Sequence, residues 1–438
     1  MQNSSDMANI NHEGYQDRLA LVEDILRKYG LQPTDVTPVA YEKDCPFPYN
    51  NFIYKVELTE PVTPSSFSDA PSCTVRPLSV GVSKVIIRLS NPKAGGLNHL
   101  NRVENEVAAM YLARKGLGSF KPGLEAVIPA VYAWQAGSSA TGGLSWLLME
   151  YKAGVQLDEQ FNFLSETEKK NVIEQIADVF SGIQRCELPE GVDCYGGLSV
   201  DGEGKVVSGE MTTLKGGPWK GYDAFWQARL VAQLKNADES SALEGWRPNG
   251  VRERIEGFLV DGLSEVFAKA GVDIRKRVLV HGDLTMNNML IDPNTNNLTA
   301  LLDFDFSFIA PPAHEFFTSL QDLGGNTGGV HGPDPTEGRL SKALLTGNFD
   351  VEDVPEAGKG LWIKARNWDE AMARRRTVRP SDIQGIEVLD RLRKLEGLIC
   401  PFRLVHPVFL KKQTNEEIAE ARAKAEKMLV EELEHYGH

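Results

Sequence analysis

The sequence predicts an α+β protein with a small, strand-rich N-terminal part and a larger, mainly helical C-terminal part. Three segments rich in Val, Ile and Tyr indicate antiparallel strands at residues 36–41, 51–58 and 83–89. Later segments repeat apolar residues at helical spacing, most clearly over residues 166–185 and 255–267. With 438 residues, the chain is long enough for two or three parts that each have a core.

A helix is expected to open the N-terminal part. Apolar side chains recur with the helical period from Tyr15 to Tyr29, and Gly30 follows as a stop signal. A stretch rich in proline and serine, near residues 60–80, separates the second and third strands. We interpret it as a surface insertion rather than as part of the core.

The boundary between the two parts is predicted after one more strand. Residues 145–151 (Ser-Trp-Leu-Leu-Met-Glu-Tyr) indicate that strand, and Lys152 to Gly154 follow it as a crossing. We therefore expect an N-terminal lobe over residues 1–151 and a C-terminal lobe over residues 152–438. The glycine-rich region 324–358 is expected to form a long excursion before the terminal helices.

Charge and composition exclude several classes of function. The 47 Lys and Arg residues against 61 Asp and Glu leave a net charge of −14, which repels nucleic acid. The basic run Arg374 to Arg376 is better interpreted as a solvated helix face. The five cysteines form no C-x-x-C pair, which favours a reducing compartment. Without an apolar leader or an apolar run of about 18 residues, we expect a cytoplasmic protein with no membrane contact.

The most informative segment lies between residues 278 and 308. Two short apolar strands, 289–291 and 298–302, flank a turn-like stretch and are expected to pair as a hairpin. If the turn is centred between residues 295 and 296, antiparallel pairing sets Asn288 opposite Asp303 at the open end.

Asp283 lies just upstream, so a loop can bring a carboxylate, an amide and a second carboxylate together. Magnesium prefers hard oxygen ligands such as those of Asn288 and Asp303. A separate carboxylate must accept or orient the proton of an attacking hydroxyl. The alternative for each residue alone is a turn cap or a strand end. The spacing H-x-D-x-x-x-x-N arises by chance in roughly one such chain in fifty, which favours the functional interpretation.

The motif His-Gly-Asp-Leu-Thr-Met-Asn-Asn, from His281 to Asn288, followed by Leu-Asp-Phe around Asp303, resembles the catalytic core of the aminoglycoside phosphotransferase and choline kinase superfamily. The resemblance implies a two-lobed protein-kinase-like fold that uses ATP and Mg²⁺. It implies Asp283 as the catalytic base, Asn288 and Asp303 as magnesium ligands, and His281 as an organiser of the catalytic loop.

The resemblance extends to residues on either side of this core. Asp305 would be a carboxylate behind the metal ligands, and Glu315 would brace the catalytic loop rather than touch the substrate. The third strand of the family carries a basic residue that holds nucleotide phosphates, and Arg88 is implied here because Lys84 lies too early. An arginine can hold phosphate through two parallel hydrogen bonds.

The partner glutamate of Arg88 should come from the next helix. Periodicity does not choose between Glu104 and Glu106, and either could be a solvated helix charge. Similarity to the family pattern favours Glu106. Met149 and Tyr151 resemble the strand between the lobes, whose backbone binds adenine.

Two features carry weaker signals. The predicted turn at residues 44–50 has no glycine, so a glycine-rich phosphate loop of the protein-kinase type is absent from the sequence. An aromatic cluster could hold a cationic acceptor, but core packing is the favoured interpretation. The cluster comprises Trp219, Tyr222, Phe225 and Trp226.

We therefore expect an ATP- and Mg²⁺-dependent phosphotransferase that moves the γ-phosphate to a hydroxyl, less readily an amine, of a small neutral or cationic molecule. The alternative class is a non-catalytic, nucleotide-binding pseudokinase or scaffold. Protein kinase activity is disfavoured, since no A-P-E segment follows Asp303 at the expected place. The sequence leaves open the acceptor, the choice between ATP and GTP, and the oligomeric state.

Overall fold

The computed structural model describes residues 10–39, 45, 47–77, 81–137, 144–271, 275–327, 335–350, 354 and 356–438. The chain divides into two compact units, each built from two segments. The first unit combines Met1–Pro218 with Met286–Phe308, and the second combines Trp219–Thr285 with Ile309–His438. The lobe boundary expected at residue 151 stays a prediction.

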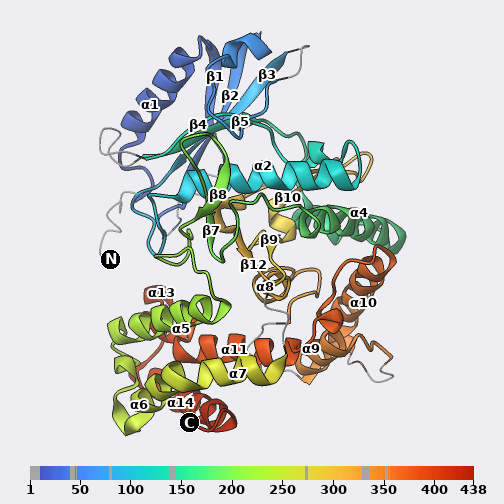
Figure 1. Cartoon of the computed structure of the whole chain (residues 1–438). Coiled ribbons are helices and arrows are strands. Elements are labelled where there is room, and N and C mark those ends of the chain that lie inside the picture. The colour runs from blue at the N-terminus through green and yellow to red at the C-terminus, as the bar shows by residue number, and fades with distance from the viewer. Residues whose placement is uncertain are drawn as a thin grey trace, which may run out of the picture. The chain divides into compact units, whose positions relative to one another are not determined.

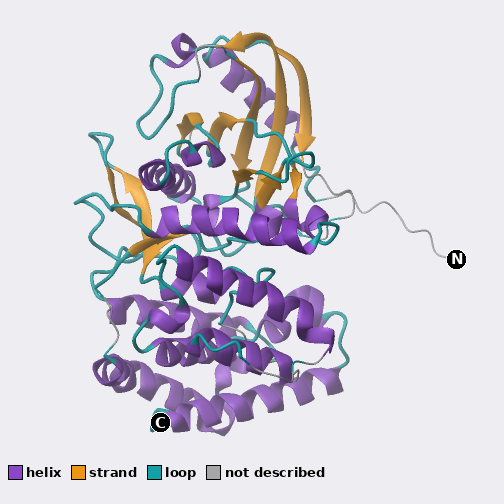
Figure 2. Cartoon of the chain, turned by 90° about the vertical axis from the view of Figure 1, so that its right-hand side faces the viewer, coloured by secondary structure: helices purple, strands orange, loops and turns teal. Residues whose placement is uncertain are grey.

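A five-stranded antiparallel sheet forms the N-terminal end of the first unit (Figure 1). The expected pairing of the second and third strands is present over a long register, from Asn51 opposite Ser90 to Glu57 opposite Lys84. Figure 2 shows these strands as one curved layer. The order across the sheet is β1 (Pro33–Val39), β2 (Asn51–Val62), β3 (Val82–Ser90), β5 (Trp146–Glu150) and β4 (Val131–Gln135).

One face of this sheet builds a core with the opening helix, α1 (Tyr15–Lys28). Alternation along β3 sends Val85, Ile87 and Leu89 into that core, as the two-residue strand period requires. The helix ends where predicted, and Gly30 follows it with a φ of 66° that favours glycine. The strand β4 was not predicted from the sequence.

The stretch near residues 60–80 departs from the expected surface insertion. The strand β2 continues to Val62, and a short 3-10 helix (Pro64–Phe67) follows it. Phe67 is buried in the sheet core, with its ring stacked 5.5 Å from that of Tyr132. The described part of this segment is therefore attached to the sheet, by Phe67 and by the hydrogen bond from the N–H of Val75 to the carbonyl of Val131, although its composition resembles that of a loop. Residues 78–80 lie outside the described residues.

The rest of the first unit is mixed. The helix α2 (Arg102–Phe120) packs against α4 (Glu166–Gln184), the helix predicted over residues 166–185. A capping box formed by Ser165 and Glu168 begins α4. Gly116 and Gly182 allow this approach, since a Cβ on Gly116 would lie 2.7 Å from the Gly182 carbonyl oxygen. The remaining elements are α3 (Leu157–Phe161), the pair β7 (Gly197–Val200) and β8 (Val206–Gly209), and a sheet of β6 (Val155–Gln156), β10 (Met289–Ile291) and β11 (Leu298–Leu301).

The second unit is mainly helical. Two helices, α9 (Pro335–Thr346) and α10 (Lys359–Arg374), share a small core around Trp362, so the expected excursion at 324–358 contains a packed helix. No helix among the described residues is both long and apolar enough to cross a membrane. The other elements are α5 (Tyr222–Glu239), α6 (Val251–Gly257), α7 (Leu263–Ala270), β9 (Val278–Val280), β12 (Phe308–Ala310), α8 (Ala313–Thr318), α11 (Ile386–Ile399), α12 (Phe402–Val405), α13 (Pro407–Leu410) and α14 (Asn415–His435).

The predicted fold class is confirmed. A small antiparallel sheet stands near the N-terminus of the chain, and helices dominate the remainder.

Candidate active site

A buried arginine on β3 is the centre of a cluster of charges in the first unit. Arg88 is only 4% exposed. Its guanidinium pairs with Glu106 and lies 3.1 Å from a carboxylate oxygen of Asp303 and 3.9 Å from one of Asp305. Lys84 lies four residues earlier on the strand, is 46% exposed and pairs with Glu57 instead. Of the two basic residues on β3, only Arg88 joins the cluster.

The geometry of α2 explains why Glu106, and not Glu104, faces Arg88. Residues two apart on a helix point to nearly opposite sides, whereas residues four apart share a face. Glu106 lies four residues after Arg102, and both are buried. Glu104 turns the other way and accepts a hydrogen bond of 2.6 Å from the hydroxyl of Ser199. The structure thus separates two residues that the sequence pattern left equal.

The aspartates after β11 differ in their surroundings. Asp303 has a left-handed backbone (φ 59°), and its side chain is 37% exposed. Asp305 is buried and accepts hydrogen bonds of 2.8 and 3.0 Å from Nε of Arg102 and of 3.1 Å from the amide of Asn51. Asp303 therefore keeps an accessible carboxylate, while the carboxylate of Asp305 is buried and hydrogen-bonded to Arg102 and Asn51.

Opposing electrostatic effects act on these two carboxyls. The crowded surroundings of Asp303 raise its pKa, Arg88 opposes the rise, and the negative charge of Asp305 adds to it. Burial also disfavours the charged form of Asp305, but hydrogen bonds from Arg102 and the charge of Arg88 outweigh it and hold the pKa below the ordinary value. The pair is thus arranged so that Asp305 is ionised first.

The hairpin register differs by one residue from the expected one. Met289 lies opposite Leu301 and Leu290 opposite Ala300, and the pairing shifts between Leu290 and Ile291. The carbonyl of Asn288 accordingly accepts a 2.8 Å hydrogen bond from the N–H of Leu302, not of Asp303. The pair Ile291–Leu298 places the turn centre one residue earlier than assumed, which by itself would set Asn288 opposite Leu301. The extra residue in β11, Thr299, then moves the partner to Leu302. Asn288 is buried and still lies at the open end of the hairpin, next to the segment that leads to Asp303.

The segment from His281 to Leu284, in the second unit, is held by a buried glutamate. Glu315 on α8 accepts hydrogen bonds from the backbone N–H of His281 at 2.6 Å and of Gly282 at 3.1 Å. It also accepts one from the hydroxyl of Ser319, which in turn accepts one from the N–H of Leu284. The bracing expected of Glu315 is thus present in the structure.

His281 and Asp283 occupy different environments within this segment. His281 is fully buried, and its Nδ1 accepts a 3.3 Å hydrogen bond from the N–H of Asp283. The side chain of Asp283 is half-buried. Burial raises the pKa of Glu315, and the charge of Asp283 adds to this effect against the hydrogen bonds that Glu315 accepts.

Met149 and Tyr151 lie at the end of β5. Met149 is half-buried and pairs in register with Ile86 on one side and Val131 on the other. Tyr151 is half-buried just beyond the strand. Both belong to the same unit as the Arg88 cluster. Their adenine-binding role stays a prediction.

The aromatic cluster in the second unit is mainly core. Tyr222, Phe225 and Trp226 are buried around His314, whose Nε2 lies 2.8 Å from the Tyr222 hydroxyl. Trp219 is half-buried, with its ring 5.6 Å from that of Phe225. The favoured interpretation, core packing, is therefore confirmed for the three buried residues.

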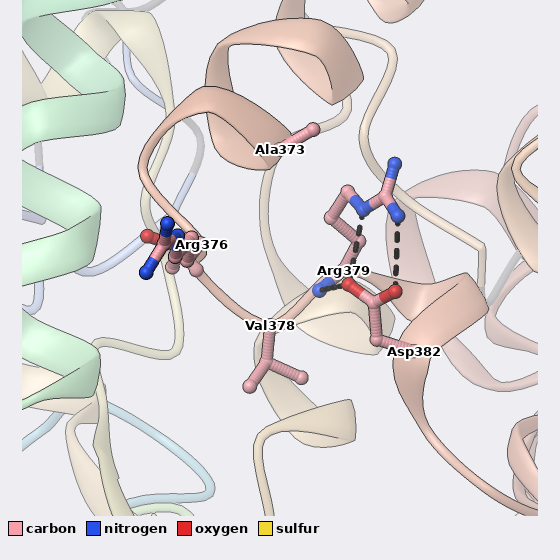
Figure 3. A pocket seen from close by; sticks show the side chains of 6 residues that line it. Ala373, Arg376, Val378, Arg379 and Asp382 are labelled. Atoms are coloured by element: carbon pink, nitrogen blue, oxygen red, sulfur yellow. Dashed lines mark hydrogen bonds and ion pairs between the residues drawn. The ribbon is translucent and has the colours of Figure 1, made fainter.

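A pocket of about 370 Å³ lies in the second unit, at the end of α10, and none of the residues described above lines it (Figure 3). Arg379 and Asp382 line it, and they bind each other through a hydrogen bond of 3.0 Å. Arg379 also donates to Asp369 at 3.0 Å. The charge of Arg379 in this pocket is thus paired with two carboxylates, and Arg376 also lines the pocket.

Sequence reasoning missed Arg102 as a member of the charge cluster. It is buried, and it binds Asp305 with two nitrogens. The signal was its spacing: Arg102 and Glu106 lie four residues apart at the start of an otherwise apolar helix face, where buried charges need partners.

The donor set suits magnesium bound together with nucleotide phosphates. No group of three or more His, Cys, Asp or Glu side chains that could hold a metal occurs among the described residues. The half-exposed carboxylate of Asp303 and the amide of Asn288 are hard oxygen donors, and Mg²⁺ in nucleotide sites takes its other ligands from phosphates and water. These residues fit a metal that arrives with its nucleotide.

A buried basic residue on the third strand, paired with a glutamate of the next helix and next to an accessible aspartate, is the arrangement of kinase-type nucleotide sites. The model of the phosphotransferase enzyme family matches residues 80–361, more than half of the chain. The chain belongs to this family, which confirms the resemblance of its central motif.

Solved structures similar to the chain include the gentamicin–APH(2″)-IIa complex (13% identity, 93% of this chain and 95% of that chain, TM-score 0.46). They also include a thermostable mutant of aminoglycoside phosphotransferase APH(4)-Ia with ADP and hygromycin B (13% identity, 94% of this chain and 97% of that chain, TM-score 0.42). A third is the Plasmodium vivax ethanolamine kinase (12% identity, 99% of this chain and 95% of that chain, TM-score 0.43). None of the curated proteins compared with the chain matches it.

Proposed function

We propose that this protein transfers the γ-phosphate of ATP to a hydroxyl group of a small molecule, with Mg²⁺ as the metal. The observation that carries the proposal is Arg88, buried between Glu106 and the accessible carboxylate of Asp303. A buried cation with a fixed orientation is suited to phosphate oxygens, and its glutamate partner keeps it in place when no nucleotide is bound.

Arg88 would hold the nucleotide phosphates, and Glu106 would orient Arg88. Asp303 and Asn288 would hold the metal, which when bound neutralises charge on the β- and γ-phosphates. Asp305 keeps Arg102 neutralised and so prevents a second buried cation from competing for the phosphates. Met149 and Tyr151 would lie along the adenine.

Asp283 is proposed as the base that accepts or orients the proton of the acceptor hydroxyl. His281 and Glu315 fix the backbone on which it stands, through the hydrogen bonds to residues 281–284. A base on a loop held at three backbone positions loses little orientation freedom on binding, which is what positioning catalysis requires.

The acceptor is proposed to be small, hydroxylated, and neutral or cationic. The net charge of −14 disfavours polyanions. The similar structures named above include complexes with gentamicin and hygromycin B and an ethanolamine kinase, so amino sugars and amino alcohols are the first classes to test. The five free cysteines favour a reducing compartment such as the cytoplasm.

The competing hypothesis is a pseudokinase that binds nucleotide without transferring phosphate. The presence of Asp283, Asn288 and Asp303 together weighs against it, since nucleotide binding alone gives no reason to keep a base. The two hypotheses differ in one observable, the formation of phosphorylated product.

An ATP-consumption screen against a library of hydroxylated small molecules, followed by mass analysis of the products, tests the proposal. We expect at least one acceptor to gain a phosphoryl group in a magnesium-dependent reaction. Magnesium-dependent ATP binding with no product from any compound class would instead favour the pseudokinase.

A further inference from the structure

A buried asparagine before α1, Asn11, holds residues 47–49, in the described part of the connection between β1 and β2. The side-chain amide of Asn11 donates a 2.8 Å hydrogen bond to the carbonyl of Phe47, and its oxygen accepts a 2.7 Å bond from the N–H of Tyr49. Asn11 is 1% exposed, so both bonds are shielded from water. One side chain thus fixes two backbone groups of the loop, two residues apart.

Arg18 on α1 holds Asn11 itself. Its guanidinium donates a 2.7 Å hydrogen bond to the backbone carbonyl of Asn11 and one of 3.3 Å to the hydroxyl of Tyr54 on β2. It also stacks 3.7 Å over the ring of Phe52, on the same strand. The arginine is buried, so it acts as a fixed connection between the N-terminal segment and β2.

The same loop is tied down from the other side. Asn91, directly after β3, donates a 2.7 Å hydrogen bond from its side chain to the carbonyl of Tyr49, and its N–H donates one of 2.9 Å to the carbonyl of Asn50. The next residue, Asn51, donates to Asp305. Residues 47–51 are therefore bonded to Asn11 at one end and, through Asn51 and Asp305, to the charge cluster around Arg88 at the other.

We propose that Asn11 is a positioning residue for the nucleotide: it fixes residues 47–50, directly before β2, in the form that receives the phosphates. This inference rests on the proposed function, because it assigns the loop to the nucleotide of that site. Residues 47–50 lead directly into β2, in which Ile53, three residues after Asn50, lies opposite the proposed phosphate-binding residue Arg88. A glycine-rich loop closes flexibly over phosphates, whereas residues 47–50, which contain no glycine, are held by the side chains of Asn11 and Asn91.

Preorganisation gives the expected size of the effect. If removing Asn11 leaves the loop in its binding form for only a tenth of the time, the apparent Kd for nucleotide rises about 10-fold. The acceptor binds other residues, so its KM should stay unchanged. The effect is therefore selective for the nucleotide, which a general loss of stability would not produce.

Gln175 on α4 provides a matched control. Its side chain donates a 2.9 Å hydrogen bond to the carbonyl of Asn296 and accepts one of 2.8 Å from the N–H of Leu298. These bonds repeat the pattern of Asn11, on the turn of the β10–β11 hairpin at the end away from Asn288. Gln175→Ala therefore removes the same chemistry from a loop that the proposal does not involve.

The experiment measures Mg-ATP binding by calorimetry and amide hydrogen exchange of residues 47–51 in wild type, Asn11→Ala and Gln175→Ala. We expect Asn11→Ala to raise the Kd about 10-fold and to speed exchange at Tyr49 by a similar factor, with Gln175→Ala unchanged in both. Asn11→Asp keeps the acceptor for Tyr49 but loses the donor to Phe47. It should give a smaller rise, about 3-fold, and it remains informative if the alanine variant does not fold.

Two results would overturn the inference: wild-type ATP affinity in Asn11→Ala and Asn11→Asp, or an equal loss of affinity in Gln175→Ala. Failure of the proposed function is distinguishable, because a wild type that binds no ATP would leave the exchange rate at Tyr49 to test the loop contact by itself. Unchanged exchange in Asn11→Ala would then show that Asn11 does not hold the loop.

Discussion

Nη1 of Arg88 lies 3.1 Å from Oδ1 of Asp303, while Nη2 of the same guanidinium pairs with Glu106. The arginine is thus held between a helix carboxylate that is buried and a loop carboxylate that is accessible. A lysine has no planar fork with which to hold two carboxylates in this geometry.

Arg88→Lys should therefore keep the positive charge but lose one of the two contacts. We expect Mg-ATP affinity to fall about 10-fold, with little change in the KM for the acceptor. Calorimetric titration of Mg-ATP into both proteins checks this, and Lys84→Ala, on the same strand but outside the cluster, is the control. Equal affinities in wild type and Arg88→Lys would remove Arg88 from the nucleotide site.

Asp283→Asn should retain the fold and the nucleotide affinity but lower turnover by about 10²- to 10⁴-fold, the usual range for the loss of a positioned base. The isosteric amide cannot accept the acceptor's proton. Steady-state rates with the identified acceptor, together with a melting curve for each protein, measure the effect. Near-normal turnover would show that Asp283 is not the base.

Asp303→Ala should abolish most of the magnesium dependence of ATP binding, because the nucleotide phosphates lose their metal-mediated link to the protein. Titration of ATP with and without Mg²⁺ into wild type and variant checks this. Identical magnesium dependence in the two proteins would contradict the metal assignment.

Arg102→Met should destabilise the protein by about 3–5 kcal/mol, since it leaves the buried carboxylate of Asp305 without its principal partner. Replacing both residues, as Arg102→Met with Asp305→Leu, should recover part of that loss because no charge then stays buried alone. Urea unfolding of the single and double variants measures the difference. A double variant less stable than Arg102→Met would refute the explanation.

Asp390 on α11 predicts a dependence of stability on pH. Burial raises its pKa to about 7, with Glu432 adding to the rise and Lys394 and Arg393 opposing it. The unfolded carboxyl titrates near pH 4, so between about pH 4 and 7 the folded state holds the extra proton. Stability contributed by this group is complete below that range and is lost as the pH rises through it, by up to about 1.4 kcal/mol per pH unit.

Asp390→Asn removes this slope, so the variant should gain stability relative to wild type between pH 5 and pH 8. Urea unfolding at the two pH values measures the change. A constant difference between the two proteins would show that Asp390 does not hold a proton in the folded state.

Periodicity predicted α1, α4 and most of the first sheet because each of these elements has one apolar face, but it did not indicate α9, which lies within the expected excursion. Sequence pattern gave a wrong expectation where the position of one or two residues determines the local structure. Phe67 enters the core from a stretch whose composition indicates a surface loop. The hairpin turn is centred one residue earlier than assumed, and a bulge in β11 offsets only part of that difference, so Leu302 and not Asp303 pairs with Asn288. A bulge leaves no clear trace in a short apolar strand.

In the candidate site, too, residues close together in the sequence were predicted, and residues with distant partners were not. The motif around Asp283, Asn288 and Asp303 was found because its spacing is local, and Glu315 because the resemblance carried it. Arg102 and Asn11 were missed because their partners lie 203 and 36–38 residues away along the chain. Only the folded structure brings such pairs together.

Phosphorylated product is the measurement that tests the central claim most directly. Purified protein with ATP and Mg²⁺ is incubated with a library of hydroxylated small molecules, and with casein and histone, alongside the Asp283→Asn variant; mass analysis then identifies every product. We predict that wild type phosphorylates a small hydroxylated compound, that the protein substrates stay unlabelled, and that Asp283→Asn yields little product. Efficient labelling of casein or histone with no small-molecule product, or equal product from both enzymes, would contradict the account.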